Sequence, residues 1–310
     1  MMPRHAALVL NLALASLLAA CASAPDAAPA DEGILFDDFT YARVDELAAN
    51  RWIVRTAPGW PGVPGASWGP QSVSLVDDPD RPGNRLLRMT SSTAGTPETT
   101  RQTQICHERK YLEGTYAARV RFTDAPETGP DGDRIVQTFY LISPLKAPMD
   151  LDYSETDFEY LPNGGWGHEG PTMFATTWET FHPEPEWKAD NQSGTLSGSF
   201  AGWRTLLLQI DDGAVRYRVD GRLLADHGGR YYPEVPMSVN FNLWFIRDEL
   251  VDSPVVRRWI EDIDWVYHRA GEVLTTAEVE AEVSDLRRRG TRFADTVPAH
   301  DPPLVSPCDF

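Results

Sequence analysis

Three carboxylates alternate along one short stretch of this sequence. Glu155, Asp157 and Glu159 are separated by Thr156 and Phe158. β-Branched and aromatic residues at these interleaved positions favour a β-strand over a helix. Because successive side chains of a strand point to opposite faces, the three acids share one face and the interleaved residues point into a core. Like charges along one strand face repel each other, so the pattern indicates a functional site.

Short apolar or alternating segments recur along the rest of the chain. The clearest cover residues 116–122, 135–142, 203–210 and 237–246, and Asp-Gly or Pro-Gly pairs punctuate the sequence between such segments. Many short strands separated by turn signals are typical of all-β folds. We therefore predict a two-sheet antiparallel β-sandwich of the jelly-roll kind. One helix is expected near the C-terminus, where Thr275 and Glu278 form a capping box.

The N-terminus has the pattern of a targeting segment. Residues 6–18 are apolar but too short for a comfortable transmembrane helix, and the sequence Leu-Ala-Ala-Cys then ends at Cys21. This ending resembles the lipobox of bacterial lipoproteins, with an ordinary signal peptide and a chance cysteine as the alternative. The expected division is as follows: signal peptide 1–21 with Cys21 lipidated, Ala/Pro tether 22–33, jelly-roll domain 34–270, and C-terminal helix and tail 271–310.

Charge and cysteine content limit the partners and the compartment. The formal net charge of −18 argues against nucleic acid and against electrostatic binding to an anionic membrane. Membrane contact is therefore expected only through the N-terminal lipid, on a monomer anchored to the bacterial cell envelope and facing the periplasm or the surface. If Cys21 carries lipid, Cys106 and Cys308 remain, and an oxidising compartment favours a disulfide between them. Two unpaired thiols are the alternative.

The alternating acids carry the chemistry that glycosidic bonds require. One carboxylate attacks the anomeric carbon, while a second protonates the leaving oxygen and later activates water. An acid between them, here Asp157, would keep the pKa values of its neighbours apart. The three groups are expected to titrate as a coupled set.

At this point the sequence resembles glycoside hydrolase family 16, whose members carry Glu-x-Asp-x-Glu on a strand of a concave sheet. Residues 155–159 match that motif, and the match extends over residues 34–268 in the family's order. Further matching segments are Phe36–Phe39, Tyr111–Tyr116, Trp203–Gly221, Pro236–Trp244 and Asp264–Tyr267. The sequence departs from the family at Thr156, where an aliphatic residue is usual, and over residues 162–191, which follow no subfamily pattern.

The resemblance implies a retaining endo-glycoside hydrolase that acts on a β-linked polysaccharide, with β-glucan favoured. Glu155 would be the nucleophile, Asp157 the assisting acid and Glu159 the general acid/base. No cofactor is required, although family members often hold a structural calcium, for which Asp264 matches by position. The alternatives are a transglycosylase of the same fold and a non-catalytic carbohydrate-binding envelope lipoprotein.

Aromatic and amide side chains are the candidate sugar contacts. Trp244 shares a predicted strand face with Asn240 and Asn242, which offers a stacking platform beside hydrogen-bonding groups. A structural role is the alternative for each of these side chains and for the loop candidates. The further candidates are Trp60, Trp68, Trp166, Trp178 and His168.

Overall fold

The computed structural model describes residues 1, 32–306 and 308 of the 310-residue chain. Glu32–Phe310 form one compact unit, which includes the predicted jelly-roll domain and the C-terminal helix. Cys21 and residues 22–31 of the predicted tether lie outside the described residues. Within the described part of the chain, no helix is long and apolar enough to cross a membrane.

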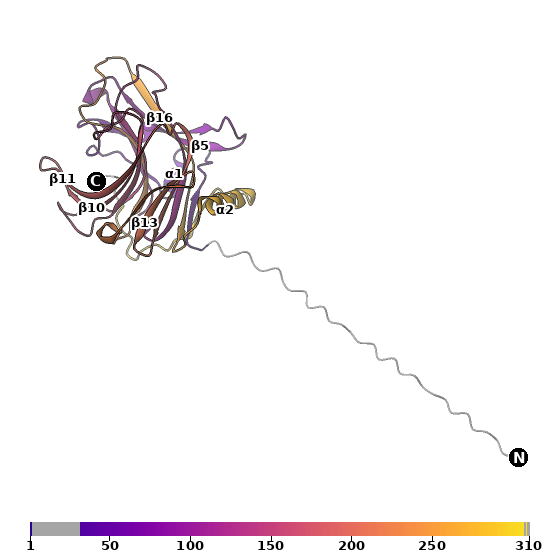
Figure 1. The fold of residues 1–310 in the computed structure, drawn as a ribbon. Coiled ribbons are helices and arrows are strands. Elements are labelled where there is room, and N and C mark those ends of the chain that lie inside the picture. The colour runs from indigo at the N-terminus through magenta and orange to yellow at the C-terminus, as the bar shows by residue number, and fades with distance from the viewer. Residues whose placement is uncertain (2–31, 307, 309–310) are drawn as a thin grey trace. The chain divides into compact units, whose positions relative to one another are not determined.

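Strands dominate the element order, as the sequence predicts (Figure 1). The elements are β1 (Ile34–Asp37), α1 (Glu46–Ala49), β2 (Ile53–Val54), β3 (Ser67–Trp68), β4 (Val73–Asp77), β5 (Arg85–Thr93), β6 (Arg101–Cys106), β7 (Gly114–Phe122), β8 (Ile135–Ile142), β9 (Glu155–Leu161), β10 (Thr172–His182), β11 (Lys188–Ser197), β12 (Gly202–Asp211), β13 (Ala214–Val219), β14 (Arg222–Gly228), β15 (Ser238–Phe245), β16 (Arg257–Ala270), α2 (Thr276–Arg288) and β17 (Phe293–Asp295).

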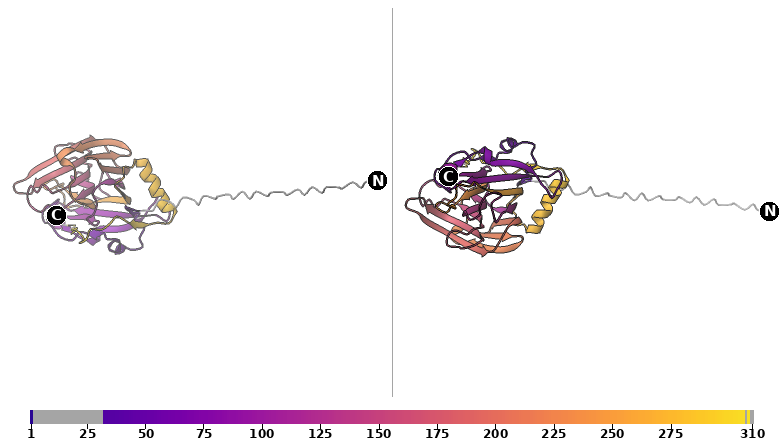
Figure 2. Two further views of the ribbon diagram at one scale, coloured as in Figure 1. Left: turned by 90° about the horizontal axis from the view of Figure 1, so that it is seen from below. Right: turned by 90° about the horizontal axis from the view of Figure 1, so that it is seen from above.

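The strands form two curved layers that face each other (Figure 2). The front sheet has the order β2-β6-β15-β8-β9-β10-β11 with antiparallel pairing between these strands, and β3 pairs in parallel with the start of β6. The back sheet has the order β4-β5-β16-β7-β12-β13-β14, and β1 pairs with the far end of β16. A single pairing between Ser92 of β5 and Arg101 of β6 links the two layers. This arrangement is the predicted β-jelly-roll sandwich.

The main hydrophobic core lies between the sheets, and strand alternation decides which residues enter it. On β15, Phe241 and Leu243 belong to this core, whereas Trp244 belongs to a separate apolar cluster with Phe174 of β10. The predicted division of the β15 residues between two faces is therefore confirmed. The outer face of the front sheet, which carries Trp244, is called the catalytic face below.

Helix α2 covers part of the outer surface of the back sheet, where Figure 2 shows it at the side of the molecule. Val279, Val283 and Leu286 form its buried stripe and pack in one cluster with residues of β1, β7, β12 and β16. The predicted capping box is present, with Thr275 and Glu278 bonding to each other's backbone N–H groups. The helix therefore belongs to the jelly-roll unit instead of forming a separate one.

A disulfide fastens the C-terminal tail to the front sheet. Cys106 ends β6 and is bonded to Cys308, as the cysteine count predicts. Their Cα atoms lie 5.6 Å apart, a normal separation for a disulfide.

The β10–β11 hairpin is a long one. β10 continues to His182 and pairs with β11 over ten residue positions. β11 escaped prediction because its side chains are polar and mostly exposed, so no hydrophobic period marks it. Figure 1 shows this curved pair at the edge of the front sheet.

Candidate active site

β9 places the three acids on the catalytic face, in the middle of the front sheet. Phe158 on this strand belongs to the main core, so alternation turns Glu155, Asp157 and Glu159 to the opposite side. β8 and β10 flank the strand, and Trp178 of β10 stands beside Glu155 in the register. The strand and its two faces are as predicted.

Two neighbouring side chains hold the first two acids by hydrogen bonds. The Tyr153 hydroxyl donates to Oε2 of Glu155 over 2.5 Å. The indole Nε1–H of Trp178 donates to Oδ2 of Asp157 over 2.7 Å. These donors come from the loop before β9 and from the adjacent strand, so both carboxyl groups are oriented before any substrate arrives.

Burial and mutual repulsion raise the pKa values of all three acids. Burial raises the pKa of Glu155 to about 7, against hydrogen bonds with Tyr153 and Asp157 that lower it. Burial and then the charge of Glu155 raise the pKa of Glu159 to about 8. Asp157 is raised well above its usual range by burial and by the charges of both glutamates. The effect of Glu155 on Glu159 shows that the two glutamates interact across the middle acid.

The pKa values of the two glutamates lie in an order that separates their chemical roles. Of the two glutamates, Glu155 has the lower pKa and Glu159 the higher one, so Glu159 keeps its proton to a higher pH. The hydrogen bond between Asp157 and Glu155 lowers the pKa of Glu155 and raises that of Asp157, which makes Asp157 the proton donor. Near neutral pH, Glu155 can therefore be the carboxylate while Glu159 keeps its proton.

Aromatic rings surround the acids. Trp244 is 7% exposed, and its ring centroid lies 6.1 Å from that of Trp166 and 6.4 Å from that of Trp60. Trp166 also meets Phe174 edge-on at 5.2 Å. The predicted sugar-binding residues Trp60, Trp166, Trp178 and Trp244 are thus brought together on the catalytic face.

The other predicted sugar contacts lie deeper or at the margin. Asn240 is fully buried, and its amide donates to the backbone oxygen and hydroxyl of Ser238. Asn242 accepts from the Thr138 hydroxyl over 2.6 Å. Trp68 lies 6% exposed in the same apolar cluster as Trp244, beneath the open surface, and the His168 ring meets Phe174. Asn240, Asn242 and Trp68 therefore support the catalytic face from below, and few of their atoms are exposed on it.

Four side chains around the site were not foreseen. Tyr153 bonds to Glu155, Tyr140 pairs with Asp157 across β8 and β9, and Phe174 pairs with Glu159 across β9 and β10. Trp187 follows the hairpin turn and contacts both Trp60 and Trp178. Trp187 stands directly after the sequence Pro-Glu-Pro-Glu, and a tryptophan at the end of such a polar loop is the signal that would have revealed it.

Asp264, the residue that matches a calcium position in the family, is surrounded by hydrogen-bond donors of the protein itself. One of its oxygens accepts from the Asn84 amide and from Arg287, both over 2.8 Å, and Arg81 also approaches it. Burial raises the pKa of Asp264, but the bonds and charge of Arg287 outweigh that effect and hold the pKa low. Guanidinium groups occupy the side of Asp264 where a cation would bind. Among the described residues, no group of three His, Cys, Asp or Glu side chains is arranged for a metal.

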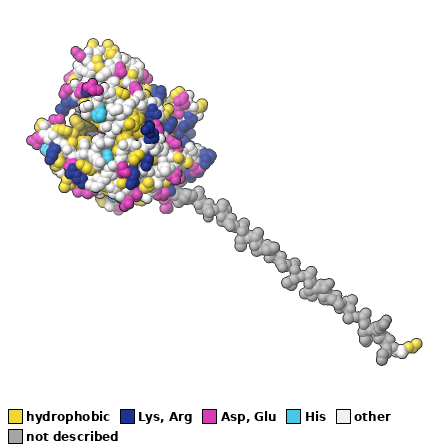
Figure 3. Space-filling view, viewed as in Figure 1, with side chains coloured by type: hydrophobic (Ala, Val, Ile, Leu, Met, Phe, Trp, Pro, Cys, Tyr) yellow, Lys and Arg dark blue, Asp and Glu magenta, His cyan; other side chains and the backbone are white. Residues whose placement is uncertain are grey.

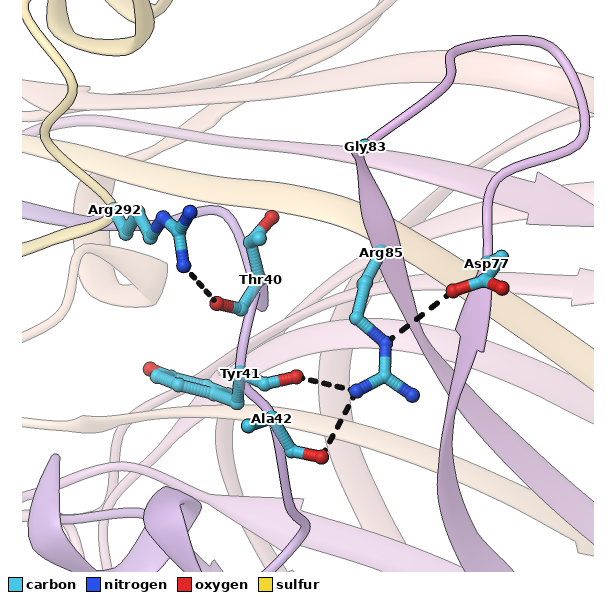
Figure 4. A pocket seen from close by; sticks show the side chains of 7 residues that line it. All are labelled: Thr40, Tyr41, Ala42, Asp77, Gly83, Arg85 and Arg292. Carbon is cyan, nitrogen blue, oxygen red and sulfur yellow. Dashed lines mark hydrogen bonds and ion pairs between the residues drawn. The ribbon is translucent and has the colours of Figure 1, made fainter.

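A second pocket lies apart from the acids, between the β4–β5 hairpin and the segment after β1 (Figure 4). Arg85 donates to the carbonyl oxygens of Tyr41 and Ala42 over 2.6 and 3.0 Å, and it pairs with Asp77. Because the Arg85 guanidinium is bonded to groups of the protein itself, this pocket has a structural role: it joins the segment after β1 to the β4–β5 hairpin. Figure 3 shows acidic and basic side chains interspersed over the face in view, without a large area of one sign.

Comparison with known proteins supports the fold. No protein-family model matches the sequence, and no curated protein matches it. Solved structures do match. A Bacillus licheniformis β-glucanase superposes with a TM-score of 0.55 at 15% identity, covering 77% of this chain and 99% of that one. A Bacteroides ovatus mixed-linkage glucan GH16 protein in complex with a G4G4G3G product gives 0.56 at 15% identity, covering 74% and 98%.

A third structure extends the range of sugars among these neighbours. The κ-carrageenase of Pseudoalteromonas carrageenovora, in complex with an oligosaccharide of κ-carrageenan, has a TM-score of 0.53 at 12% identity and covers 80% of this chain and 99% of that one. The fold of this protein is thus the β-jelly roll of glycoside hydrolase family 16 structures, as the sequence resemblance predicts.

Proposed function

We propose that this protein is a retaining endo-glycoside hydrolase that cleaves a β-glucan. The observation that carries the proposal is the set of three acids on one face of β9, two of which are held by hydrogen bonds from Tyr153 and Trp178. A lectin would gain little from three repelling carboxyl groups on a partly buried face. The glucanase titles of the structural neighbours support β-glucan as the substrate class.

In the proposed mechanism, the Glu155 carboxylate attacks the anomeric carbon while Glu159 protonates the leaving oxygen. Glu159, now ionised, then removes a proton from water, and that water releases the sugar from Glu155. Tyr153 and Asp157 donate hydrogen bonds that hold Glu155 in place and lower its pKa. A sugar hydroxyl in place of that water would give the transglycosylase alternative.

Reducing-end release from mixed-linkage β-glucan, laminarin and κ-carrageenan, with Glu155→Gln as the control, tests hydrolysis. We expect the wild type to release ends from a glucan and Glu155→Gln to release none. The proposal fails if neither protein releases ends from any polymer while both bind sugar equally, which would favour the carbohydrate-binding alternative.

Azide rescue tests the retaining course. With Glu159→Ala and an aryl β-glucoside, azide replaces water at the glycosyl-enzyme, so we expect a β-glycosyl azide as the product. An α-glycosyl azide from this variant would contradict double displacement through Glu155.

We also propose that the protein is exported and anchored by lipid on Cys21. The Cys106–Cys308 disulfide supports an oxidising compartment. Labelling with a palmitate analogue is expected for the wild type and absent in Cys21→Ala. Equal labelling of the wild type and Cys21→Ala would contradict the proposed lipid anchor on Cys21.

A further inference from the structure

One aromatic contact joins two loops that start at well-separated strands of the front sheet. Trp60 lies between β2 and β3, which both pair with β6, and Trp187 lies in the turn between β10 and β11. Strands β15, β8 and β9 separate β6 from β10 in the sheet. The ring centroids of Trp60 and Trp187 nevertheless lie 5.8 Å apart. This contact, called the tryptophan bridge below, therefore reaches across the catalytic face.

The two loops also come from opposite ends of the strands. Arg55 bonds to Gln104 and Ser67 pairs with Arg101, which places the Trp60 loop at the start of β6. That end of the sheet carries Trp244 and the last residues of β9. The hairpin turn with Trp187 lies beyond the other end, past the pairing of β10 with the first residue of β9. The tryptophan bridge consequently crosses the face on a diagonal.

The bridge completes a circuit of ring contacts around the acids. The centroid distances along it are 6.1, 5.8, 6.4, 6.1 and 5.2 Å. In order, the rings are Trp178, Trp187, Trp60, Trp244, Trp166 and Phe174. The circuit begins and ends on β10, at the residues that pair with Glu155 and Glu159. The tryptophan bridge is the one contact of this circuit that joins two loops, so it is the part that can span the face above the strands.

The bridge is the contact that opens most readily. Trp60 and Trp187 are 43% and 44% exposed, and both sit on loops. Each of the other contacts includes a ring on a strand, such as Trp244 or Phe174, which are only 7% and 6% exposed. Loops move more freely than paired strands, so a sideways approach of substrate depends on separating this one pair.

We propose that Trp60 and Trp187 are specificity-determining residues that favour chain ends and short oligosaccharides over internal segments of long polymers. This inference rests on the proposed glycosidase function and refines its endo mode: internal segments are reached only when the bridge opens. The opposite role, a stacking platform for long chains, predicts the reverse effect of mutation. The two roles are therefore distinguished by the sign of one measurement.

The test compares wild type, Trp60→Ala, Trp187→Ala and the double variant on mixed-linkage β-glucan of high molar mass and on short oligosaccharides cut from it. If the bridge excludes internal segments, each single variant should raise the ratio of polymer to oligosaccharide kcat/KM by about 2- to 10-fold, the range for loss of one aromatic pair. The double variant should add little, because either substitution opens the same contact. Viscosity should also fall further for each bond cleaved.

Leu196→Ala is the matched control, since Leu196 is a 41% exposed apolar residue on β11 outside the circuit. Its ratio should equal that of the wild type, and thermal unfolding should show that every variant is folded. If both single variants hydrolyse glucan but their ratio of polymer to oligosaccharide kcat/KM is unchanged or lower, the proposed role of Trp60 and Trp187 is overturned. Absence of hydrolysis by all proteins, wild type included, overturns the proposed function instead.

Discussion

The indole Nε1 of Trp178 donates a 2.7 Å hydrogen bond to Oδ2 of Asp157, from the strand next to the one that carries the acids. This bond lowers the pKa of Asp157, against the larger effect of burial and of the two glutamate charges. Trp178 also contacts Trp187, so one residue supports both the middle acid and the aromatic circuit.

Replacing Trp178 with phenylalanine should lower kcat by about 10-fold or more, because a hydrogen bond to a charged or strongly polarised carboxyl group is worth about 1.5–3 kcal/mol. The ring is kept while the N–H is lost. Steady-state kinetics on an oligosaccharide measure the change. Trp203→Phe on β12 of the back sheet is the matched control and should keep wild-type kcat. Equal losses in both variants would show that the effect is not specific to the Asp157 bond.

Activity should follow a narrow bell-shaped pH profile. The nucleophile must be ionised, so kcat/KM should rise with pH through the pKa of Glu155, about 7. The acid must be protonated, so kcat/KM should fall as pH passes the pKa of Glu159, about 8. With an aryl glycoside whose leaving group needs no protonation, Glu159→Gln should lose the alkaline limb and keep the acidic limb. Survival of the alkaline limb in that variant would assign it to another group.

Stability should decrease as pH rises from about 5 to 8. The pKa of Glu159 is raised from 4.5 when unfolded to about 8 when folded, so the folded state binds more protons between these values. Stability is therefore full below the lower value and is lost toward the upper one. Glu159→Gln removes this contribution, and its stability relative to wild type should grow by about 3 kcal/mol over that interval. Urea unfolding at both pH values measures it, and a pH-independent difference would contradict the raised pKa.

Arg287 should stabilise the junction of α2 with the back sheet. Its guanidinium pairs with Asp264, which is 3% exposed, and approaches Asp38. Arg287→Ala leaves buried carboxylates without this cation and should cost about 3 kcal/mol. Arg288→Ala, which removes an exposed ion pair with Asp285, should cost less than about 1 kcal/mol of unfolding free energy.

Calcium should leave the unfolding temperature of the wild type unchanged. A clear rise in that temperature would support a calcium ion at Asp264.

The disulfide should contribute through the long segment that it closes. Cys106 and Cys308 are 202 positions apart, and cross-links of this kind contribute about 2–5 kcal/mol. The double variant Cys106→Ser/Cys308→Ser should lose that amount in urea unfolding. A reductant should destabilise the wild type but leave the double variant unchanged. If reductant has no effect on the wild type, the two cysteines are not bonded in the purified protein.

The strand period explains how much of the site was predictable. Glu155, Asp157 and Glu159 share a face because alternation depends on the backbone alone, and the same rule put Trp244 on the catalytic face. The surroundings of Asp264 were not predictable in the same way, because its partner Arg287 comes from a helix outside the region of resemblance. β11 was missed for a different reason, because an exposed polar strand carries no hydrophobic pattern.

The amino-acid sequence by itself determined the fold class and the acidic face, since each depends on residue period and residue type, and it favoured one pairing of the cysteines that the structure contains. Only the tertiary structure decided which aromatic rings meet. Trp60 and Trp187 are brought together by the curvature of a hairpin and the course of a loop from another part of the sheet. No local pattern records that contact, because it forms between segments far apart in the chain.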